Sequence, residues 1–210
     1  ADIVGNIFTG NRANGLSAVG SSSGVVMGNT FDNTGFGIVI SQRSQIEVSK
    51  NRITNNRGGI IVNNLATPTI RENLIANNAE NGLTILRDRN GNPTVNMGTP
   101  DKPGLNVFLN NGVADINNAS GATLVAVGNQ VDSKKVIGAV ELVASNTPIP
   151  SPSTPEVPAT TLADVRGHWA EKQITALAQR NIIKGFNDGT FRPEAPVTRA
   201  QFAAILEAAF

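Results

Sequence analysis

The first 143 residues alternate short apolar runs with asparagines and glycines. A block that begins with asparagine recurs as NIFTGN at 6, NTFDNT at 29, NRITNN at 51, NLIANN at 73, NVFLNN at 106 and NQVDSK at 129. The intervals between these blocks are 23, 22, 22, 33 and 23 residues. Short alternating blocks are typical of strands, because a helical repeat needs longer units with a period of about 3.6 residues.

Each unit contains three apolar stretches separated by turn residues. The second position after the leading asparagine is always apolar: Phe8, Phe31, Ile53, Ile75, Phe108 and Val131. A glycine precedes the second stretch, as in GIIV at 59–62, and a third stretch such as QIEV at 45–48 closes the unit. Three strands per turn predict a mainly β chain, a parallel β-helix of about six coils in which these side chains stack as a core column.

The repeated asparagines have a structural explanation. A tight corner between strands needs positive φ, which Gly and Asn tolerate best, and stacked amides can hydrogen-bond from one coil to the next. Asn11, Asn56, Asn78 and Asn111 share one register, five residues after the leading asparagine. We therefore expect an amide ladder at this corner and not a catalytic asparagine.

This pattern resembles the right-handed parallel β-helix superfamily of pectate-lyase-like proteins, and particularly its secreted bacterial members, over residues 1–143. The resemblance implies the fold and leaves the activity open, because many functions share this scaffold. Glycoside hydrolases on it are expected to carry paired acids. Counted from each leading asparagine, no two acids share an offset on neighbouring coils. No catalytic residue is predicted, and a polysaccharide lyase or hydrolase is kept as an alternative.

The 33-residue interval contains an insertion at 87–105. Arg87, Asp88 and Arg89 make it the best place on the rod for a carbohydrate site, since loops on a rigid scaffold often carry function. The structural alternative, which we favour, is a solvated excursion with turns at Asn90-Gly91 and Pro103-Gly104.

A Pro-, Ser- and Thr-rich spacer at 144–161 separates this rod from residues 162–210. The last segment predicts a helix, a loop and a second helix. Ile174, Leu177 and Ala178 lie on one face of the first helix, and Thr198 with Gln201 forms a capping box for the second.

Residues 162–210 resemble one S-layer homology repeat, because the DV, HWA, DGTF and TRA motifs follow in order with the expected spacing. The family usually has Glu where Gln201 stands, and its tightly binding members commonly combine three repeats. The resemblance implies a non-covalent anchor on peptidoglycan-linked or secondary cell-wall polysaccharide. It also implies that the glycan site contains Asp164, Trp169, Gly185, Asp188 and Arg199.

Arg199 is the principal residue of this predicted site, because a guanidinium can hold a sugar acid bidentately. For Trp169 we favour the structural interpretation, in which it is the core anchor of the segment, over the role of a platform for the ligand. The phenylalanines of the segment are expected in its core: Phe186, Phe191 and Phe202.

Composition narrows the classes of function. A net charge of +1 with 16% charged residues argues against a nucleic-acid partner. The absence of cysteine and the single histidine, His168, exclude disulfides, thiolate sites and metal sites with two imidazoles, so no cofactor or metal is expected. No apolar run of about 18 residues predicts a membrane span. The chain begins without the features of a signal peptide, so we expect it to be processed or a fragment.

These observations together predict a secreted, cell-surface or periplasmic cell-envelope protein, more readily a non-enzymatic rod than an enzyme. A self-assembling filament is the third alternative, because exposed β-helix ends can add strands from a neighbouring chain.

Overall fold

The computed structural model describes residues 1–89, 91–148, 164–179, 182–183, 190–199, 201–202 and 205–206. At residues 172, 176 and 179 only the backbone is described. The chain divides into two compact units, Ala1–Pro152 and Ser153–Phe210.

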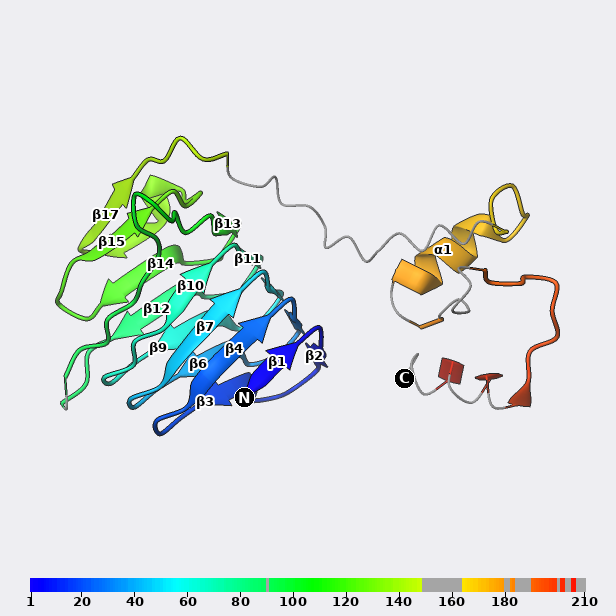
Figure 1. Ribbon diagram of the computed structural model, residues 1–210, viewed down its shortest axis with the longest axis horizontal. Helices are drawn as coiled ribbons and strands as arrows, with labels where there is room; N and C mark the ends of the chain where they lie inside the picture. The colour runs from blue at the N-terminus through cyan, green and yellow to red at the C-terminus, as the bar shows by residue number, and fades with distance from the viewer. Residues whose placement is uncertain are drawn as a thin grey trace. The chain divides into compact units, whose positions relative to one another are not determined.

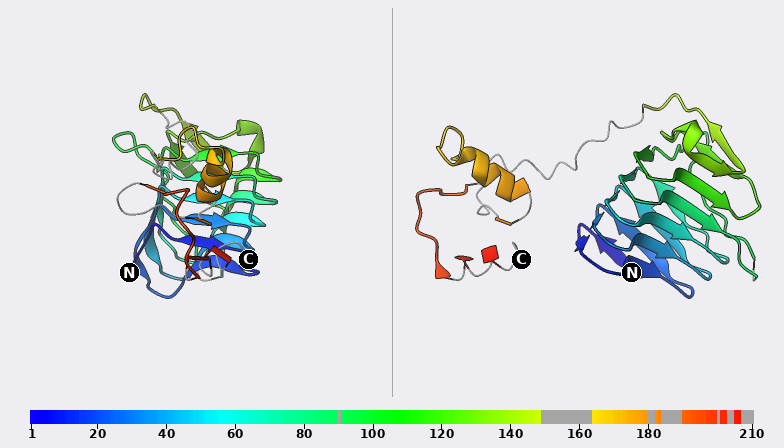
Figure 2. Two further views of the ribbon diagram at one scale, coloured as in Figure 1. Left: turned by 90° about the vertical axis from the view of Figure 1, so that its right-hand side faces the viewer. Right: turned by 180° about the vertical axis from the view of Figure 1, so that it is seen from behind.

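The first unit is a solenoid of stacked parallel strands, which form three sheets that we name A, B and C (Figures 1 and 2). Sheet A contains β1 (Asp2–Val4), β4 (Ser23–Met27), β7 (Gln45–Ser49) and β10 (Thr69–Arg71). Sheet B contains β2 (Ile7–Thr9), β5 (Thr30–Asp32), β8 (Arg52–Thr54), β11 (Leu74–Ala76) and β13 (Val107–Leu109). Sheet C contains β3 (Asn14–Ala18), β6 (Phe36–Ile40), β9 (Gly58–Val62), β12 (Asn81–Leu86), β14 (Ala114–Ala119) and β16 (Val136–Gly138).

A further parallel pair, β15 (Leu124–Val127) with β17 (Val140–Val143), lies at the C-terminal end of the solenoid, and the short 3-10 helix η1 (Ser133–Lys135) precedes β16. The chain passes through sheets A, B and C in turn, so residues about one repeat apart become neighbours. The predicted fold class, mainly β with about six coils, is confirmed.

The core is a set of columns that run along the solenoid. In sheet B the register places Phe8, Phe31, Ile53, Ile75 and Phe108 one above the other. The rings of Phe8 and Phe31 are parallel within 4°, with centroids 4.8 Å apart. Phe31, Ile53 and Ile75 are fully buried, so the predicted core column is confirmed.

Two adjacent residues have different roles at the corner between sheets B and C. The first has positive φ, as Asn55 does at 57° and Asn77 at 55°. The second, Asn56 or Asn78, is buried and joins the ladder. Asn-Asn pairs therefore recur because one residue turns the backbone and the other bonds the coils together.

The predicted ladder at this corner is confirmed for three of its four members. Asn56 Nδ2 donates to Asn78 Oδ1 at 3.1 Å, and Asn78 Nδ2 donates to Asn111 Oδ1 at 2.9 Å. The prediction for Asn11 is wrong, because its side chain is exposed and the equivalent position on the next coil is Thr34. Thr34 Oγ1 donates to Asn56 Oδ1 at 2.8 Å, so the ladder begins there.

A second and longer ladder occupies the corner between sheets A and B. Its Nδ2-to-Oδ1 distances along the chain are 3.3, 3.0, 3.0, 2.9 and 2.8 Å. Its members are the leading asparagines themselves: Asn6, Asn29, Asn51, Asn73, Asn106 and Asn129. These asparagines mark the start of each repeat in the sequence, and this shared position is the signal by which the ladder could have been predicted.

The middle of the 87–105 insertion belongs to the solenoid, so the expectation of a solvated excursion is wrong there. Asn96 bridges to Thr69 in parallel, and Met97 bridges to Ala126. Met97 is fully buried, and Val95 packs against the core. Two apolar residues at alternate positions supply the strand of sheet A that this coil otherwise lacks.

Only the flanks of the insertion leave the solenoid as turns. Asp88 and Gly91 exchange backbone hydrogen bonds of 3.2 Å, which confirms a tight turn between them, although Asn90 lies outside the described residues. The second turn spans Thr99 to Lys102 and not Pro103-Gly104, because Gly104 N donates to Val127 O of the solenoid at 2.7 Å.

The second turn is fastened to the rod by a buried guanidinium. Arg71 is 6% exposed and donates to Pro103 O at 3.2 Å, to Asn96 Oδ1 at 3.4 Å and to Lys102 O. The insertion is therefore held both by its apolar residues in the core and by the hydrogen bonds from Arg71.

The second unit contains α1 (Glu171–Gln179). Ile174 is buried with Val165 and Ile183, and Leu177 and Ala178 pack against them, so the predicted helix face is confirmed. Phe191 also packs on this cluster, as expected, whereas Phe202 is 57% exposed and the expectation for it is wrong. Phe186 lies outside the described residues.

Candidate functional site

Asp164 lies before α1 and is hydrogen-bonded to the segment at 190–192. Its carboxylate accepts hydrogen bonds from the backbone N–H groups of Phe191 at 2.9 Å and Arg192 at 2.6 Å. Arg192 has a φ of 60°, in the left-handed region, so the chain changes direction at this residue. Asp164 therefore has a structural role, because its carboxylate joins the start of the unit to the backbone at 191–192.

Trp169 lies at the start of α1 with its indole in solvent. It is 85% exposed, so the favoured prediction that it is a core anchor is wrong. The apolar cluster of the unit is centred on Val165, Ile174 and Ile183, and Trp169 is not part of it. An exposed aromatic face is a suitable surface for a sugar ring, because such a face combines a large apolar area with little conformational freedom.

His168 fixes the backbone beside this indole. Its ring nitrogen Nε2 lies 2.7 Å from Glu194 Oε1, and its ring centroid lies 5.5 Å from that of Trp169. Glu171 Oε2 accepts from Gly167 N at 2.7 Å just before the helix. These contacts hold the turn that presents Trp169.

Arg199 lies in the first turn of the second helical stretch. The predicted capping box is confirmed there: Gln201 N donates to Thr198 Oγ1 at 3.2 Å, and Thr198 N donates to Gln201 Oε1 at 2.9 Å. Arg199 is exposed. Across the described residues, the structure records no contact that joins it to Trp169 or Asp164. Gly185 and Asp188 lie outside the described residues.

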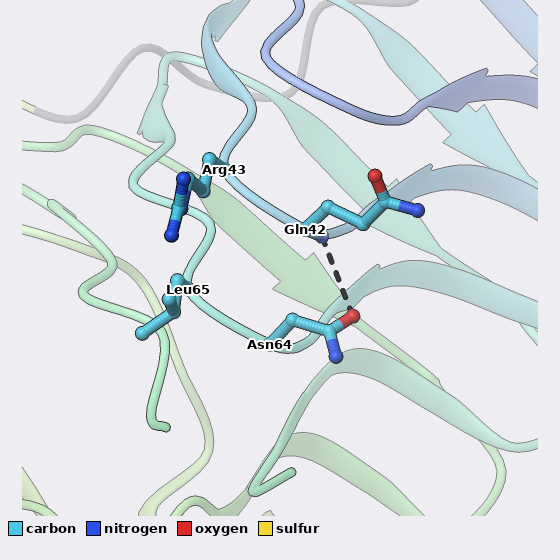
Figure 3. Close-up of a pocket in the computed structure, with 4 residues that line it drawn as sticks. All are labelled: Gln42, Arg43, Asn64 and Leu65. Carbon is cyan, nitrogen blue, oxygen red and sulfur yellow. Dashed lines mark hydrogen bonds between the residues drawn. The ribbon is translucent and has the colours of Figure 1, made fainter. Parts of the chain in front are cut away.

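On the solenoid, the predicted carbohydrate residues lie beside an open hollow of about 190 Å3. Gln42, Arg43, Asn64 and Leu65 line it, and they come from the turns that lead from sheet C to sheet A in two stacked coils. Figure 3 shows Arg43 above Leu65 and Gln42 above Asn64, with a hydrogen bond of 3.3 Å from Gln42 N to Asn64 Oδ1.

The turn at 88–91 adjoins this hollow. Asn64 Nδ2 donates to the carboxylate of Asp88. A Cβ on Gly91 would lie 2.4 Å from Leu65 Cδ2, so the turn rests directly on that side chain. Arg87 and Arg89 are exposed. The arginines of the insertion and Arg43 thus come from adjoining turns, which the sequence alone did not bring together.

Some classes of site are not found in the described part of the chain. No group of three or more His, Asp or Glu side chains there could hold a metal ion. Among those same residues, no helix is long and apolar enough to cross a bilayer.

Two family models match the chain. The model described as a right handed beta helix region matches residues 1–150, and the model of the S-layer homology domain matches residues 161–203. No solved structure matches the chain.

Similar curated proteins share a short stretch with it. A cellulosome-anchoring protein of Acetivibrio thermocellus is 47% identical over 47 residues, which cover 22% of this chain and 10% of that protein. The outer membrane protein SlpA of Deinococcus radiodurans is 46% identical over 66 residues, which cover 31% of this chain and 5% of that protein. An endo-1,4-beta-xylanase A of Thermoanaerobacterium saccharolyticum is 39% identical over 46 residues, 22% of this chain and 4% of that protein. The chain therefore spans a tenth or less of these relatives.

Proposed function

Because the chain belongs to the right-handed β-helix family and continues into an S-layer homology domain, we propose that it is a cell-surface rod anchored non-covalently to cell-wall polysaccharide. Proteins with an anchoring or outer-membrane name share this stretch with it. The observation that carries the proposal is an exposed aromatic and an exposed guanidinium, Trp169 and Arg199, on the matched segment.

The chemistry of these two side chains suits an acidic wall glycan. The guanidinium of Arg199 can bind a carboxylate or ketal acid through two parallel hydrogen bonds. The indole of Trp169 can cover the apolar face of a neighbouring sugar. Asp164 and His168 act indirectly in this proposal, by fixing the backbone that carries the indole.

The full chain with Arg199→Ala is expected to bind sacculi of its own organism at least about tenfold more weakly than the unchanged chain. Co-sedimentation with sacculi that keep their attached polysaccharide measures this loss. Sacculi stripped of that polysaccharide should retain neither chain. Arg166→Ala is the matched control, because Arg166 is also an exposed arginine of this unit. Equal losses for the two variants, or full binding by Arg199→Ala, would overturn the proposal.

The hollow on the rod supports a carbohydrate-binding role as a second candidate. Arg43, Gln42 and Asn64 offer polar groups around the apolar side chain of Leu65, which is 37% exposed. Arg43→Gln should weaken binding of an acidic oligosaccharide about tenfold. Fluorescence anisotropy measures it, in an Arg199→Ala background that removes the anchor. Arg52→Gln, on sheet B, is the control, and equal affinity of the two variants would argue against this role.

A further inference from the structure

One column of sheet C changes its chemistry beside Asn111, the last member of the shorter ladder. On the earlier coils the register places a glycine at this position: Gly15, Gly37, Gly59 and Gly82. An added Cβ on Gly82 would lie 2.9 Å from Asn111 Nδ2, so this column lies directly against the ladder amide. Asp115 follows Gly82 in the register, and Lys135, the residue before β16, holds the same place on the last coil. A carboxylate and an amine therefore succeed the glycines next to Asn111.

The side-chain amide of Asn111 is enclosed and hydrogen-bonded at both of its ends. Asn111 is 0% exposed and Asp115 is 1% exposed. Asn111 Oδ1 accepts from the backbone N–H of Asn78 at 3.3 Å and from Asn78 Nδ2 at 2.9 Å. Asn111 Nδ2 donates to Ile75 O at 3.1 Å and to Asp115 Oδ1 at 2.9 Å. Among the asparagines of the two ladders, the structure records a carboxylate partner for Nδ2 at Asn111 alone, within the residues it describes.

Lys135 brings its amine to the same asparagine. Its Nζ donates to the backbone oxygen of Asn111. On the preceding coil a backbone N–H has this role, since Gly112 N donates to Asn78 O at 2.8 Å. Only the carbonyl carbon, Cα and Cβ of Asn111 separate that oxygen from the amide carbon Cγ, so rotation within the flexible stem of Lys135 brings Nζ against Cγ. In the part of the chain that the structure describes, no ion pair joins Lys135 to Asp115, so the amine is not held away from the amide by the carboxylate.

We infer that Lys135 and Asn111 become joined by an amide bond between their side chains, with Asp115 as the proton carrier of the reaction. The Lys135 amine, in its neutral form, attacks Asn111 Cγ, and the new C–N bond forms as the electron pair of the carbonyl moves onto Oδ1. The two N–H donors of Asn78 stabilise the negative charge on this oxygen. Both nitrogens are then on one carbon, so Asp115 accepts a proton from the attacking nitrogen and passes it to Nδ2. The bond from Cγ to Nδ2 breaks and ammonia leaves, so the exchange of one amide for another consumes no further reactant.

The fold favours this reaction over the usual reaction of an asparagine that precedes glycine. An amine held beside a fixed amide reacts as if its concentration were very high, because the solenoid has already set the positions of both groups. The backbone nitrogen of Gly112 is the competing nucleophile for Asn111 Cγ, and its hydrogen bond to Asn78 O at 2.8 Å holds it away. The new bond closes a loop between residues 24 positions apart, which stabilises the last coils chiefly by restricting the unfolded chain. These coils lead directly into the spacer at 144–161.

Intact mass spectrometry of the folded full chain tests this bond. The expected mass is lower than the mass calculated from the sequence by one molecule of ammonia, and a tryptic digest should contain a branched peptide that joins Asn111 to Lys135. Lys135→Arg keeps a cationic donor for Asn111 O but has no amine, so this variant should have its full calculated mass. Asp115→Asn removes the proton carrier and should leave most of the chain unreacted. Lys134→Arg changes the neighbouring exposed lysine and is the matched control, which should still lose ammonia.

An unchanged chain that keeps its full calculated mass, while its circular dichroism shows a folded solenoid, would overturn the inference. Loss of ammonia that persists in Lys135→Arg would overturn it too, because it would indicate a succinimide at an Asn-Gly pair such as Asn14-Gly15. A gain of mass at Asn111 from hydrolysis of its amide would have the same consequence. The mass of the unchanged chain requires no variant, so a variant that failed to fold would not shield the inference from this test.

Discussion

Asn51→Ala is expected to lower the free energy of unfolding of the solenoid by about 3 to 5 kcal/mol. Asn51 Nδ2 donates to Val26 O at 2.8 Å and to Asn73 Oδ1 at 3.0 Å, and its Oδ1 accepts from Asn29 N and Nδ2 at 2.9 and 3.0 Å. The substitution removes all four bonds at a site that is 2% exposed. Water cannot replace them, so donors and acceptors on both neighbouring coils lose their partners.

Urea unfolding followed by circular dichroism measures this change, with hydrogen exchange at the amide of Asn29 as a local readout, because stacked repeats can unfold in parts. Asn6→Ala is the control. Asn6 is exposed and only donates within the ladder, at 3.0 Å to Val4 O and 3.3 Å to Asn29 Oδ1. Its loss should cost about 1 kcal/mol or less. Equal losses of unfolding free energy for Asn51→Ala and Asn6→Ala would show that the buried ladder does not stabilise the solenoid.

Gly59→Ala is expected to destabilise the chain by about 3 kcal/mol or to prevent folding. A Cβ at this position would lie 2.2 Å from Gly82 O and 3.0 Å from Ile75 Cγ2. The obstacle is the backbone of the next coil, which cannot move without breaking the sheet C pairing of β9 with β12. Space, and not backbone angle, therefore requires glycine here. The thermal unfolding midpoint and the yield of soluble protein measure the effect.

Gly28→Lys is the matched control, since it adds a longer side chain to a glycine of the same solenoid. Gly28 has a φ of 65°, and an added Cβ would meet nothing within 4 Å. The equivalent positions on the next coils hold Lys50 and Glu72 at φ 55° and 54°. The expected cost is about 1 kcal/mol or less. A Gly28→Lys variant less stable than Gly59→Ala would contradict the steric explanation.

The stretch NRITNNRGGIIV, at residues 51–62, shows how far repeated sequence carries the structure. Its alternation predicted that Ile53 belongs to the core column, and its register predicted that Asn56 joins a ladder. The pattern did not separate Asn55, which turns the backbone, from Asn56, which bonds to the next coil. It also did not show that the leading Asn51 belongs to a ladder of its own.

The same division holds for the second unit, which contains the S-layer homology domain. Motif spacing indicated the domain, the helix face and the capping box, because each depends on residues close together in the chain. The exposure of Trp169 depends on which side chains the small apolar cluster takes in, and the sequence offered two roles for it. The glycan-binding roles of Trp169 and Arg199 remain predictions.

The sequence by itself determined the β-helix and the S-layer homology domain of this protein. A period of about 22 residues, with alternating apolar positions, leaves one efficient way to bury those side chains, namely stacking each coil on the last. Only the tertiary structure decided that Met97 completes a coil from inside an insertion, that the turn at 88–91 lies against Asn64 and Leu65, and that Asp115 accepts the hydrogen bond of the ladder residue Asn111. Each of these depends on contacts whose partners are set by how the coils stack and not by the local pattern.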